Sequence, residues 1–250
     1  MPLKRWKITI EYDGRDYSGW QRQENVPSIQ QSIEEAITKF CQQEIVIHAA
    51  GRTDAGVHAC GQVAHFDLDY GERPLSGFEL LKAINAHLRP QPISILHAEE
   101  VSEDFHARYS AVNKMYRYLI LNRPAPPTFQ ANQVWRIKKP LDAEKMHEAA
   151  QVLLGHHDFT TFRDSQCQAK SPLRTLDRLD IHREGDIIVI EAEARSFLHH
   201  QIRNFIGTLV LVGENKWTPN DVKVALEAKD RTKGGITAPA AGLYLFRVDF

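Results

Sequence analysis

The sequence has few cysteines and no long apolar run. Its three cysteines, Cys41, Cys60 and Cys167, lie far apart, and none belongs to a CxxC pair. This usage argues against a disulfide-stapled secreted domain and favours a reduced, cytoplasmic setting. The apolar run IGTLVLV at residues 206–212 is far shorter than the roughly 20 residues of a membrane-spanning helix. Since the first residues also contain no signal-peptide core, we expect a cytoplasmic protein without membrane association.

Several enzyme signatures are also missing. The chain contains no G-x-x-x-x-G-K-[ST], no G-x-G-x-x-G after a strand and no G-x-S-x-G. Nucleotide hydrolysis, dinucleotide redox chemistry and serine esterase chemistry therefore lack their usual motifs. With 250 residues, 42% hydrophobic and 25% charged, the composition is that of an ordinary globular protein of one large or two small domains.

Charge is nearly balanced overall but unevenly distributed. The formal net charge is −1, yet residues 1–108 hold 11 Lys and Arg against 16 Asp and Glu, and residues 109–250 hold 20 against 16. Residues 105–141 contain no acidic side chain and seven basic ones: Arg108, Lys114, Arg117, Arg123, Arg136, Lys138 and Lys139. A second cluster follows: Arg163, Lys170, Arg174, Arg178 and Arg183. Such a concentration of cations favours a polyanionic partner, although cations also protect exposed sheet edges.

The hydrophobic pattern repeats one order of elements twice. In the first half, alternating residues 7–12 predict a strand, residues 28–40 a helix capped by Ser28, residues 45–47 and 63–66 two strands, residues 78–88 a helix and residues 93–96 a strand. The second half predicts strands at 116–120, 187–192 and 243–250, a hairpin turn at 183–186, and helices after Asp142 and over 197–212.

This order predicts an α+β fold of two ferredoxin-like (RRM-like) subdomains, residues 1–108 and 109–250. Their mostly antiparallel sheets are expected to join into one extended sheet with the helices on one face. The active-site cleft is expected between the halves.

The loop GRTDAGVHACG at residues 51–61 is the most unusual segment. It places a guanidinium, a hydroxyl, a carboxylate, an imidazole and a thiol between two strands, and loops carried by a rigid sheet often hold catalytic groups. Two other interpretations stay open here. Asp54 alone is compatible with a simple Asx turn. His58, Cys60 and His65 could bind a metal, although no recognised ligand spacing is present.

Two further features carry chemistry. Arg203 lies in the apolar segment 197–212, on a stripe with His199 and Gly207, and a buried arginine there would need a carboxylate partner such as Asp54. The alternative is an ordinary surface arginine. Tyr116 and Tyr118 alternate with Lys114 and Arg117 and should share one face of their strand, a pattern that suits base stacking or, more commonly, a core strand.

These segments resemble the tRNA pseudouridine synthase A family. GRTDAGVHA at residues 51–59 matches the active-site motif of that family without a departure, and six supporting blocks follow in the order of the family. They include residues 61–66, 105–108, 116–118, 155–162, 197–204 and 242–245.

The resemblance implies an isomerase that converts uridine to pseudouridine at positions 38, 39 and 40 of the tRNA anticodon stem-loop, with no metal and no cofactor. It implies base flipping and assigns Asp54 as the catalytic residue. Arg203 would pair with that carboxylate, Tyr116 would stack on the flipped uracil and help remove the C5 proton, and Arg52 would support the flipped conformation.

The resemblance also implies a homodimer that binds one tRNA across both protomers. The expected substrate-binding residues are Tyr116, Leu243, Leu245, Arg108, Lys114 and Arg117. Two alternatives are a non-catalytic tRNA-binding or chaperone module and a metal-dependent hydrolase that uses His58, Cys60 and His65.

Overall fold

The computed structural model describes residues 3–71 and 74–250, which divide into two compact units. The first unit is Met1–Val112 with Tyr244–Phe250, and the second is Asn113–Leu243. Our expected boundary at residue 108 therefore lies slightly early, and the last strand belongs with the first unit. The physical reason is that this strand, β11 (Leu243–Asp249), pairs in parallel with β3 (His58–Leu68), through Tyr244 opposite His58.

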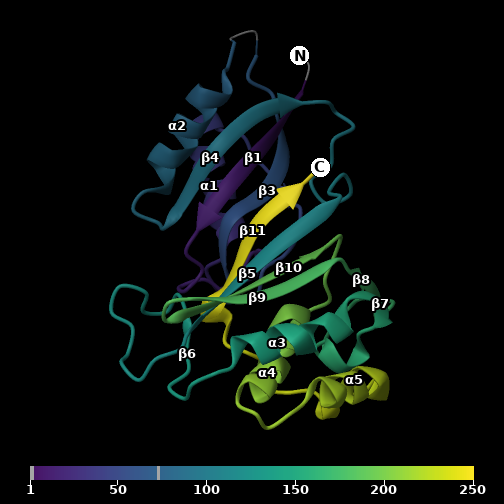
Figure 1. The fold of residues 1–250 in the computed structure, drawn as a ribbon. Coiled ribbons are helices and arrows are strands. Elements are labelled where there is room, and N and C mark those ends of the chain that lie inside the picture. Colours follow the sequence, from purple (N-terminus) through teal and green to yellow (C-terminus); the bar gives the residue numbers. More distant parts are fainter. Residues whose placement is uncertain (1–2, 72–73) are drawn as a thin grey trace. The chain divides into compact units, whose positions relative to one another are not determined.

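The first unit has the element order strand, helix, strand, strand, helix, strand. In the described residues these are β1 (Lys4–Tyr12), α1 (Ile29–Cys41), β2 (His48–Ala49), β3, α2 (Gly77–Leu88) and β4 (Ile93–Val101). β1 lies between β4 and β3 and is antiparallel to both, and β2 also pairs antiparallel with β3. Figure 1 shows α1 and α2 beside this sheet and β11, in yellow, next to β3.

Alternation of buried and exposed residues explains this packing. Trp6, Ile8 and Ile10 of β1 are buried on one face of the sheet. Helix α1 buries Ile33 and Ile37 on its apolar side. Every second residue of a strand, and every third or fourth residue of a helix, points to the same side. The apolar residues at these spacings in β1 and α1 therefore face the core.

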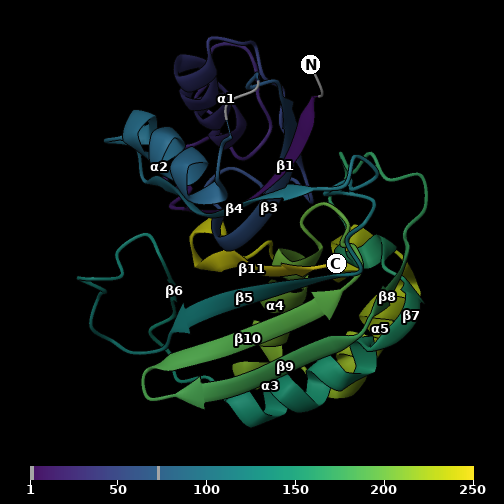
Figure 2. The ribbon, with the colours of Figure 1, turned by 90° about the horizontal axis from the view of Figure 1, so that it is seen from above.

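The second unit contains a three-stranded antiparallel sheet in the order β5 (Asn113–Leu121), β10 (Ile187–Ala194) and β9 (Arg178–Glu184). The short β6 (Trp135–Arg136) pairs in parallel with β5, and β7 (Gly155–Asp158) pairs with β8 (Leu173–Leu176) in a separate sheet. Helices α3 (Ala143–Ala150), α4 (Gln201–Gly213) and α5 (Pro219–Ala228) cover one face of the larger sheet (Figure 2).

The described residues therefore form a mixed α+β protein with mostly antiparallel strand pairs and five α-helices. None of these helices has the length and apolar character that crossing a bilayer requires. Tyr118 is fully buried, and its hydroxyl donates a hydrogen bond to Pro239 O at 2.8 Å. Burial raises the pKa of this phenol, and Tyr118 is a core residue.

The structure corrects several expected elements. The helix expected over 197–212 begins only at Gln201, because His200 has a left-handed backbone with φ 61°. His199 precedes the helix and does not share a helical stripe with Arg203. The strand expected at 45–47 is irregular, and strand pairing begins at His48. Phe78, in the first turn of α2, is an apolar residue of the expected helix that stays 67% exposed.

Candidate active site

The segment around Asp54 connects β2 and β3 in the first unit and is held by main-chain hydrogen bonds. Trp20 N donates to Thr53 O at 3.0 Å, and Gly56 N donates to Tyr17 O at 3.3 Å. Val57 N donates to the main-chain oxygen of Asp54 at 3.1 Å, which closes a turn at the carboxylate. Three main-chain hydrogen bonds therefore fix the backbone on both sides of Asp54.

Two glycines permit this close packing. Gly19 has φ +95°, and a Cβ atom there would lie 2.6 Å from Thr53 O. A Cβ atom at Gly14 would lie 2.0 Å from Val57 O. Only glycine combines the positive φ of the first position with the missing side chain that both positions need. The glycines outside the motif are therefore part of its construction.

A buried polar group lies beneath the loop. The hydroxyl groups of Tyr12 and Thr53 are 2.8 Å apart, and the two residues are 3% and 7% exposed. Gln62 is fully buried, hydrogen-bonds Tyr12 and donates from Nε2 to Gly51 O at 2.8 Å. Burial raises the pKa of Tyr12, so the phenol stays protonated and can act as a hydrogen-bond donor. The group connects Gly51 and Thr53, on either side of Arg52, to the sheet.

Arg52 and Asp54 differ in their exposure to solvent. Arg52 is exposed and Asp54 is half-buried, whereas Thr53 between them is buried. This alternation directs the guanidinium and the carboxylate away from the core. An ionisable carboxylate on a fixed backbone is the arrangement that a nucleophile or general base requires.

His58, Cys60 and His65 do not form one ligand set. The pairing of β3 with β1 is irregular between Ala59 and Gln62, and His58 and His65, on either side of this irregularity, have different contacts. His58 Nδ1 is 3.1 Å from both Gly14 N and Asp13 Oδ1, and its ring stacks on Tyr244 at 4.8 Å. His65 Nδ1 accepts from Ala107 N at 3.2 Å. These contacts indicate structural roles for both histidines in the first unit.

In the second unit, Tyr116 and Tyr118 face the same side of β5, as the alternation predicts. Tyr116 is 8% exposed, and its ring packs edge-on against Phe197 with centroids 5.3 Å apart. Lys114, on the same side, is also 8% exposed and donates from Nζ to Arg195 O at 3.2 Å. Both residues thus touch the segment that leads into α4.

Arg203 lies in the first turn of α4 and is half-buried rather than buried. Its Nε donates to Ala238 O at 2.7 Å, and Ala238 N donates back to Arg203 O at 3.1 Å. The side chain is thereby oriented by the segment that precedes β11. Phe197, His200 and Arg203 form one short stretch, which contacts Tyr116 at one end.

Asp164 is a neighbour of this stretch that the sequence analysis missed. His200 Nδ1 is 2.7 Å from Asp164 Oδ2, and the His199 ring lies 4.0 Å from the His200 ring. Asp164 and His200 are 36 positions apart with no spacing signal, so only the fold reveals the pair. The Tyr12–Thr53–Gln62 group was missed for the same reason.

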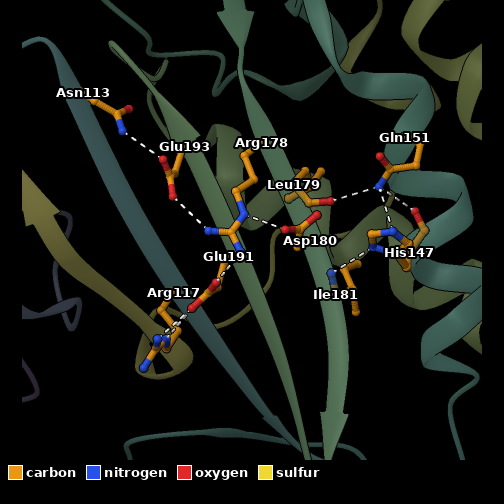
Figure 3. A network of polar contacts seen from close by, with 10 residues as sticks. All are labelled: Asn113, Arg117, His147, Gln151, Arg178, Leu179, Asp180, Ile181, Glu191 and Glu193. Carbon is orange, nitrogen blue, oxygen red and sulfur yellow. Dashed lines mark hydrogen bonds and ion pairs between the residues drawn. The ribbon is translucent and has the colours of Figure 1, made fainter.

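Arg117 points to the opposite side of β5 from Tyr116 and belongs to an ionic network (Figure 3). Its Nη2 is 2.7 Å from Glu191 Oε1, and Glu191 Oε2 is 2.9 Å from Arg178 Nη2. Arg178 also pairs with Asp180 at 2.5 Å and with Glu193 at 3.0 Å. Two cations expected in an RNA-binding face are therefore engaged by carboxylates. Phosphate binding by Arg117 stays a prediction.

The remaining expected site residues differ in exposure. Arg108 is exposed, and its guanidinium lies 6.0 Å from the centre of the Tyr109 ring. Leu243 is 5% exposed and Leu245 is fully buried. Their positions in the strand are as expected, and their contact with a uracil stays a prediction.

Comparison with known proteins agrees with these features. A family model described as tRNA pseudouridine synthase matches residues 8–110 and 149–250. A tRNA pseudouridine synthase A of Rhodospirillum rubrum is 56% identical over 248 residues, which cover 99% of this chain and 88% of the relative. Proteins of the same name from Paramagnetospirillum magneticum and Parvibaculum lavamentivorans are each 54% identical over 248 residues. These alignments cover 99% of this chain in both cases, and 96% and 100% of the two relatives.

The matched regions contain the Asp54 loop, the Asp164–His200 pair and Arg203, and the full-length relatives extend the similarity across β5. The chain belongs to the tRNA pseudouridine synthase family.

Proposed function

We propose that this chain isomerises uridine to pseudouridine at positions 38, 39 and 40 of the anticodon stem-loop of tRNA. The observation that carries the proposal is the loop at residues 51–59, whose backbone is fixed around Asp54 by Trp20, Tyr17 and the buried Tyr12–Thr53–Gln62 group. Family membership supports the reaction class. The C1′–N1 bond breaks, the uracil turns and C5 forms the new bond to C1′.

Asp54 is the proposed catalytic residue. A carboxylate can add to the base or the sugar, or remove a sugar proton, and each route begins with the ionised form. Arg203 is proposed to pair with it, which would favour that ionised form. The Ala238 contacts that orient Arg203 support this role because they hold the guanidinium at the start of α4.

A uridine in a helical stem must leave the stack before it can react. Extrusion costs a few kcal/mol, and a protein must supply contacts that replace stacking and pairing. We assign stacking on the flipped uracil and help in removing the C5 proton to Tyr116, apolar contacts to Leu243 and Leu245, and support of the flipped state to Arg52. The exposed guanidinium of Arg52, two residues before Asp54, is compatible with such a role.

The architecture proposed for this function is a pair of ferredoxin-like subdomains with the active-site cleft between them. The order β4–β1–β3 with β2 on β3 supports this for the first unit. In the second unit β5, β10 and β9 follow the corresponding order, with β11 as the expected fourth strand. We further propose that the two sheets continue into one another. In this scheme the N-terminal half carries the catalytic loop, and the C-terminal half contributes a basic face for RNA.

The proposed partner is the anticodon stem-loop, bound by a homodimer in the cytoplasm. Exposed Arg108 is the proposed phosphate contact that the structure supports best, and Lys114 and Arg117 are further candidates. The chain is nearly neutral, so combining two basic faces would explain how it binds a polyanion.

The proposal is tested by mapping pseudouridine in a tRNA that carries uridine at positions 38, 39 and 40, before and after incubation with the protein. We expect new pseudouridine at these positions and none in a matched transcript with cytidine there. Pseudouridine elsewhere would contradict the positional assignment. Binding without any isomerisation would favour the chaperone alternative.

A further inference from the structure

We propose that a cluster of three polar residues in the second unit positions Arg203 for the reaction. The cluster consists of Asn204, Arg231 and Thr237, which hydrogen-bond one another. The inference rests on the proposed function, in which Arg203 pairs with the Asp54 carboxylate. The three are positioning residues, since they act on Arg203 and not on the substrate.

The segment at residues 230–239, which we call the strap, leads from α5 toward β11 and holds Arg203. Nε of Arg203 donates to Ala238 O at 2.7 Å, and Ala238 N donates to Arg203 O at 3.1 Å. Ala238 is fully buried. One residue of the strap therefore binds both the guanidinium and the main chain of Arg203, so the position of the strap determines where the guanidinium points.

The guanidinium of Arg231 fixes the strap in turn. Its Nη2 donates to Asn204 Oδ1 at 3.0 Å and to Thr237 Oγ1 at 3.1 Å, and its Nη1 donates to Gly235 O at 2.9 Å. The hydroxyl of Thr237 donates to the same Asn204 oxygen at 2.7 Å. All of these acceptors are neutral oxygens, so the planar guanidinium acts here through the directions of its donors. Arg231 thereby connects the start of the strap to Thr237, the residue before Ala238.

Asn204 links the cluster directly to Arg203. The two residues are neighbours in α4, and Asn204 is 1% exposed. Its Oδ1 accepts from Arg231 and Thr237, and its Nδ2 donates to Phe162 O at 2.9 Å. Removing a partner of such a buried amide leaves a polar atom unsatisfied. The cluster therefore holds the start of α4 and the strap together next to Arg203.

The main chains of α4 and the strap also meet one turn further along the helix. A Cβ atom at Gly207 would collide with Ile236 O, and one at Gly235 would lie 2.5 Å from Gly207 O. The hydroxyl of Thr208, a fully buried residue, accepts from Gly235 N at 2.8 Å. The strap thus has one close-packed position on α4, and the polar cluster holds it there.

This arrangement should act on the chemical step and not on tRNA binding. A guanidinium stabilises a reacting carboxylate only at the correct distance and direction, and a misplacement of about 1 Å can lower the rate by up to about 100-fold. Because the cluster uses its hydrogen bonds inside the second unit, its loss should lower kcat with little effect on KM for tRNA.

The test compares the isomerisation kinetics of Thr237→Val, Thr237→Ser and Arg231→Gln with those of the wild type on tRNA. Thr237→Val removes the hydroxyl at nearly constant volume, and we expect kcat to fall about 10-fold with KM within about 3-fold of the wild type. Thr237→Ser keeps the hydroxyl and should retain most of the wild-type kcat. Arg231→Gln removes the guanidinium and should lower kcat at least as much as Thr237→Val.

The decisive measurement repeats Thr237→Val in an Arg203→Lys background. Lysine keeps the positive charge but has no Nε donor for Ala238 O, so the strap no longer directs the cation. Thr237→Val should then lower kcat by less than about 2-fold further, a non-additivity that a merely structural role of Thr237 would not produce.

Asn122→Ala is the matched control, because the Asn122 side chain also joins separate segments of the second unit. Its Nδ2 donates to Lys139 O at 2.7 Å, and its Oδ1 accepts from Leu141 N at 3.0 Å. This variant should lower Tm and keep the wild-type kcat.

The proposal is overturned if folded Thr237→Val and Arg231→Gln variants keep the wild-type kcat, or if the effects of Thr237→Val and Arg203→Lys on kcat simply multiply. It is also overturned if the loss appears in KM alone, which would place the cluster in tRNA binding, or if Asn122→Ala loses kcat to the same extent. A wild type that binds tRNA but isomerises no uridine would overturn the proposed function, and that result differs from each of these outcomes.

Discussion

Tyr12, Thr53 and Gln62 illustrate how single residues prepare the Asp54 loop. Their polar atoms are buried and satisfy one another, so removing one hydroxyl leaves a partner without a hydrogen bond. Such a loss costs about 1–3 kcal/mol. Such a loss should lower kcat more than it weakens tRNA binding, because the loop backbone positions the Asp54 carboxylate.

We therefore expect Tyr12→Phe to lower the free energy of unfolding by about 1–3 kcal/mol and to reduce kcat about 10-fold, with little change in KM. Thermal denaturation and steady-state kinetics measure these values. Tyr109→Phe, at a residue that is 71% exposed, is the control and should behave like the wild type. A Tyr12→Phe variant with unchanged kcat would show that the buried group does not position Asp54.

His65 gives a prediction for stability against pH. Burial, assisted by the nearby His106 and Arg5, lowers its pKa from 6.5 to about 4. The unfolded chain, with a pKa near 6.5, binds more protons between these values. The free energy of unfolding should therefore fall by up to about 3 kcal/mol as the pH drops from 6.5 to 4, and this contribution should be constant above pH 7.

Chemical denaturation of wild type and His65→Gln between pH 4 and 7 checks this contribution. The variant should lose less stability over that interval. His87→Gln, at an exposed position of α2, should retain the wild-type slope. Parallel curves for wild type and His65→Gln would contradict a neutral, buried imidazole.

At the scale of elements, the two faces of strand β5 carry side chains with different environments. One side carries Tyr116 and Tyr118 toward the helices, and the other carries Arg117 in its pair with Glu191. A cation that is already paired inside the protein should contribute to stability, whereas an exposed cation is available to phosphates. Arg108 and Arg117 provide the comparison.

We expect Arg108→Gln to weaken tRNA binding a few-fold and to lower the dependence of log K on log salt by about 0.7–0.9, the effect of one phosphate contact. Arg117→Gln, at a cation already paired with Glu191, should lower this slope less than Arg108→Gln does and should lower stability by about 1 kcal/mol, or about 2–4 °C in Tm. Binding titrations at several salt concentrations and thermal denaturation measure both. An equal reduction of the slope in the two variants would contradict this ranking.

The same elements show what the sequence could predict. Alternation located β1 and β5, and the Ser28 and Asp142 caps located α1 and α3, because these signals are local. Helix α5 was missed although Thr218, Pro219 and Asp221 form a capping box with proline at its start. The late start of α4 could not be predicted, since the left-handed backbone of His200 depends on its contact with the distant Asp164 loop.

For the site, the motif at residues 51–59 sufficed to single out Asp54. The support beneath the loop and the Asp164–His200 pair required three-dimensional structure, because their members are 9 to 50 positions apart in the first group and 36 in the second. For Arg117, the sequence pattern did not reveal its main contact. Its charge pattern suggested RNA binding, and only the cross-strand register showed its carboxylate partner.

At the scale of the whole molecule, the chain has a formal net charge of −1 and an uneven distribution of its basic residues. A nearly neutral chain needs a concentrated basic surface to bind a polyanion such as tRNA. The proposed homodimer meets this requirement by combining two basic faces. Sedimentation should give about 57 kDa, twice the 28.5 kDa of the chain, at the concentrations used for activity. A monomer that is fully active on tRNA would contradict the shared binding surface.

The central claim is that Asp54 drives the isomerisation of uridine in tRNA, and hydrogen release from C5 tests it most directly. The measurement is tritium release from tRNA labelled at uridine C5, with wild type and Asp54→Asn compared in the presence of EDTA. We predict stoichiometric release by the wild type and none by Asp54→Asn, because the new C5–C1′ bond forms only after the carboxylate has acted. Release by Asp54→Asn at the wild-type rate, or no release by a wild type shown to bind unmodified tRNA, would contradict the account.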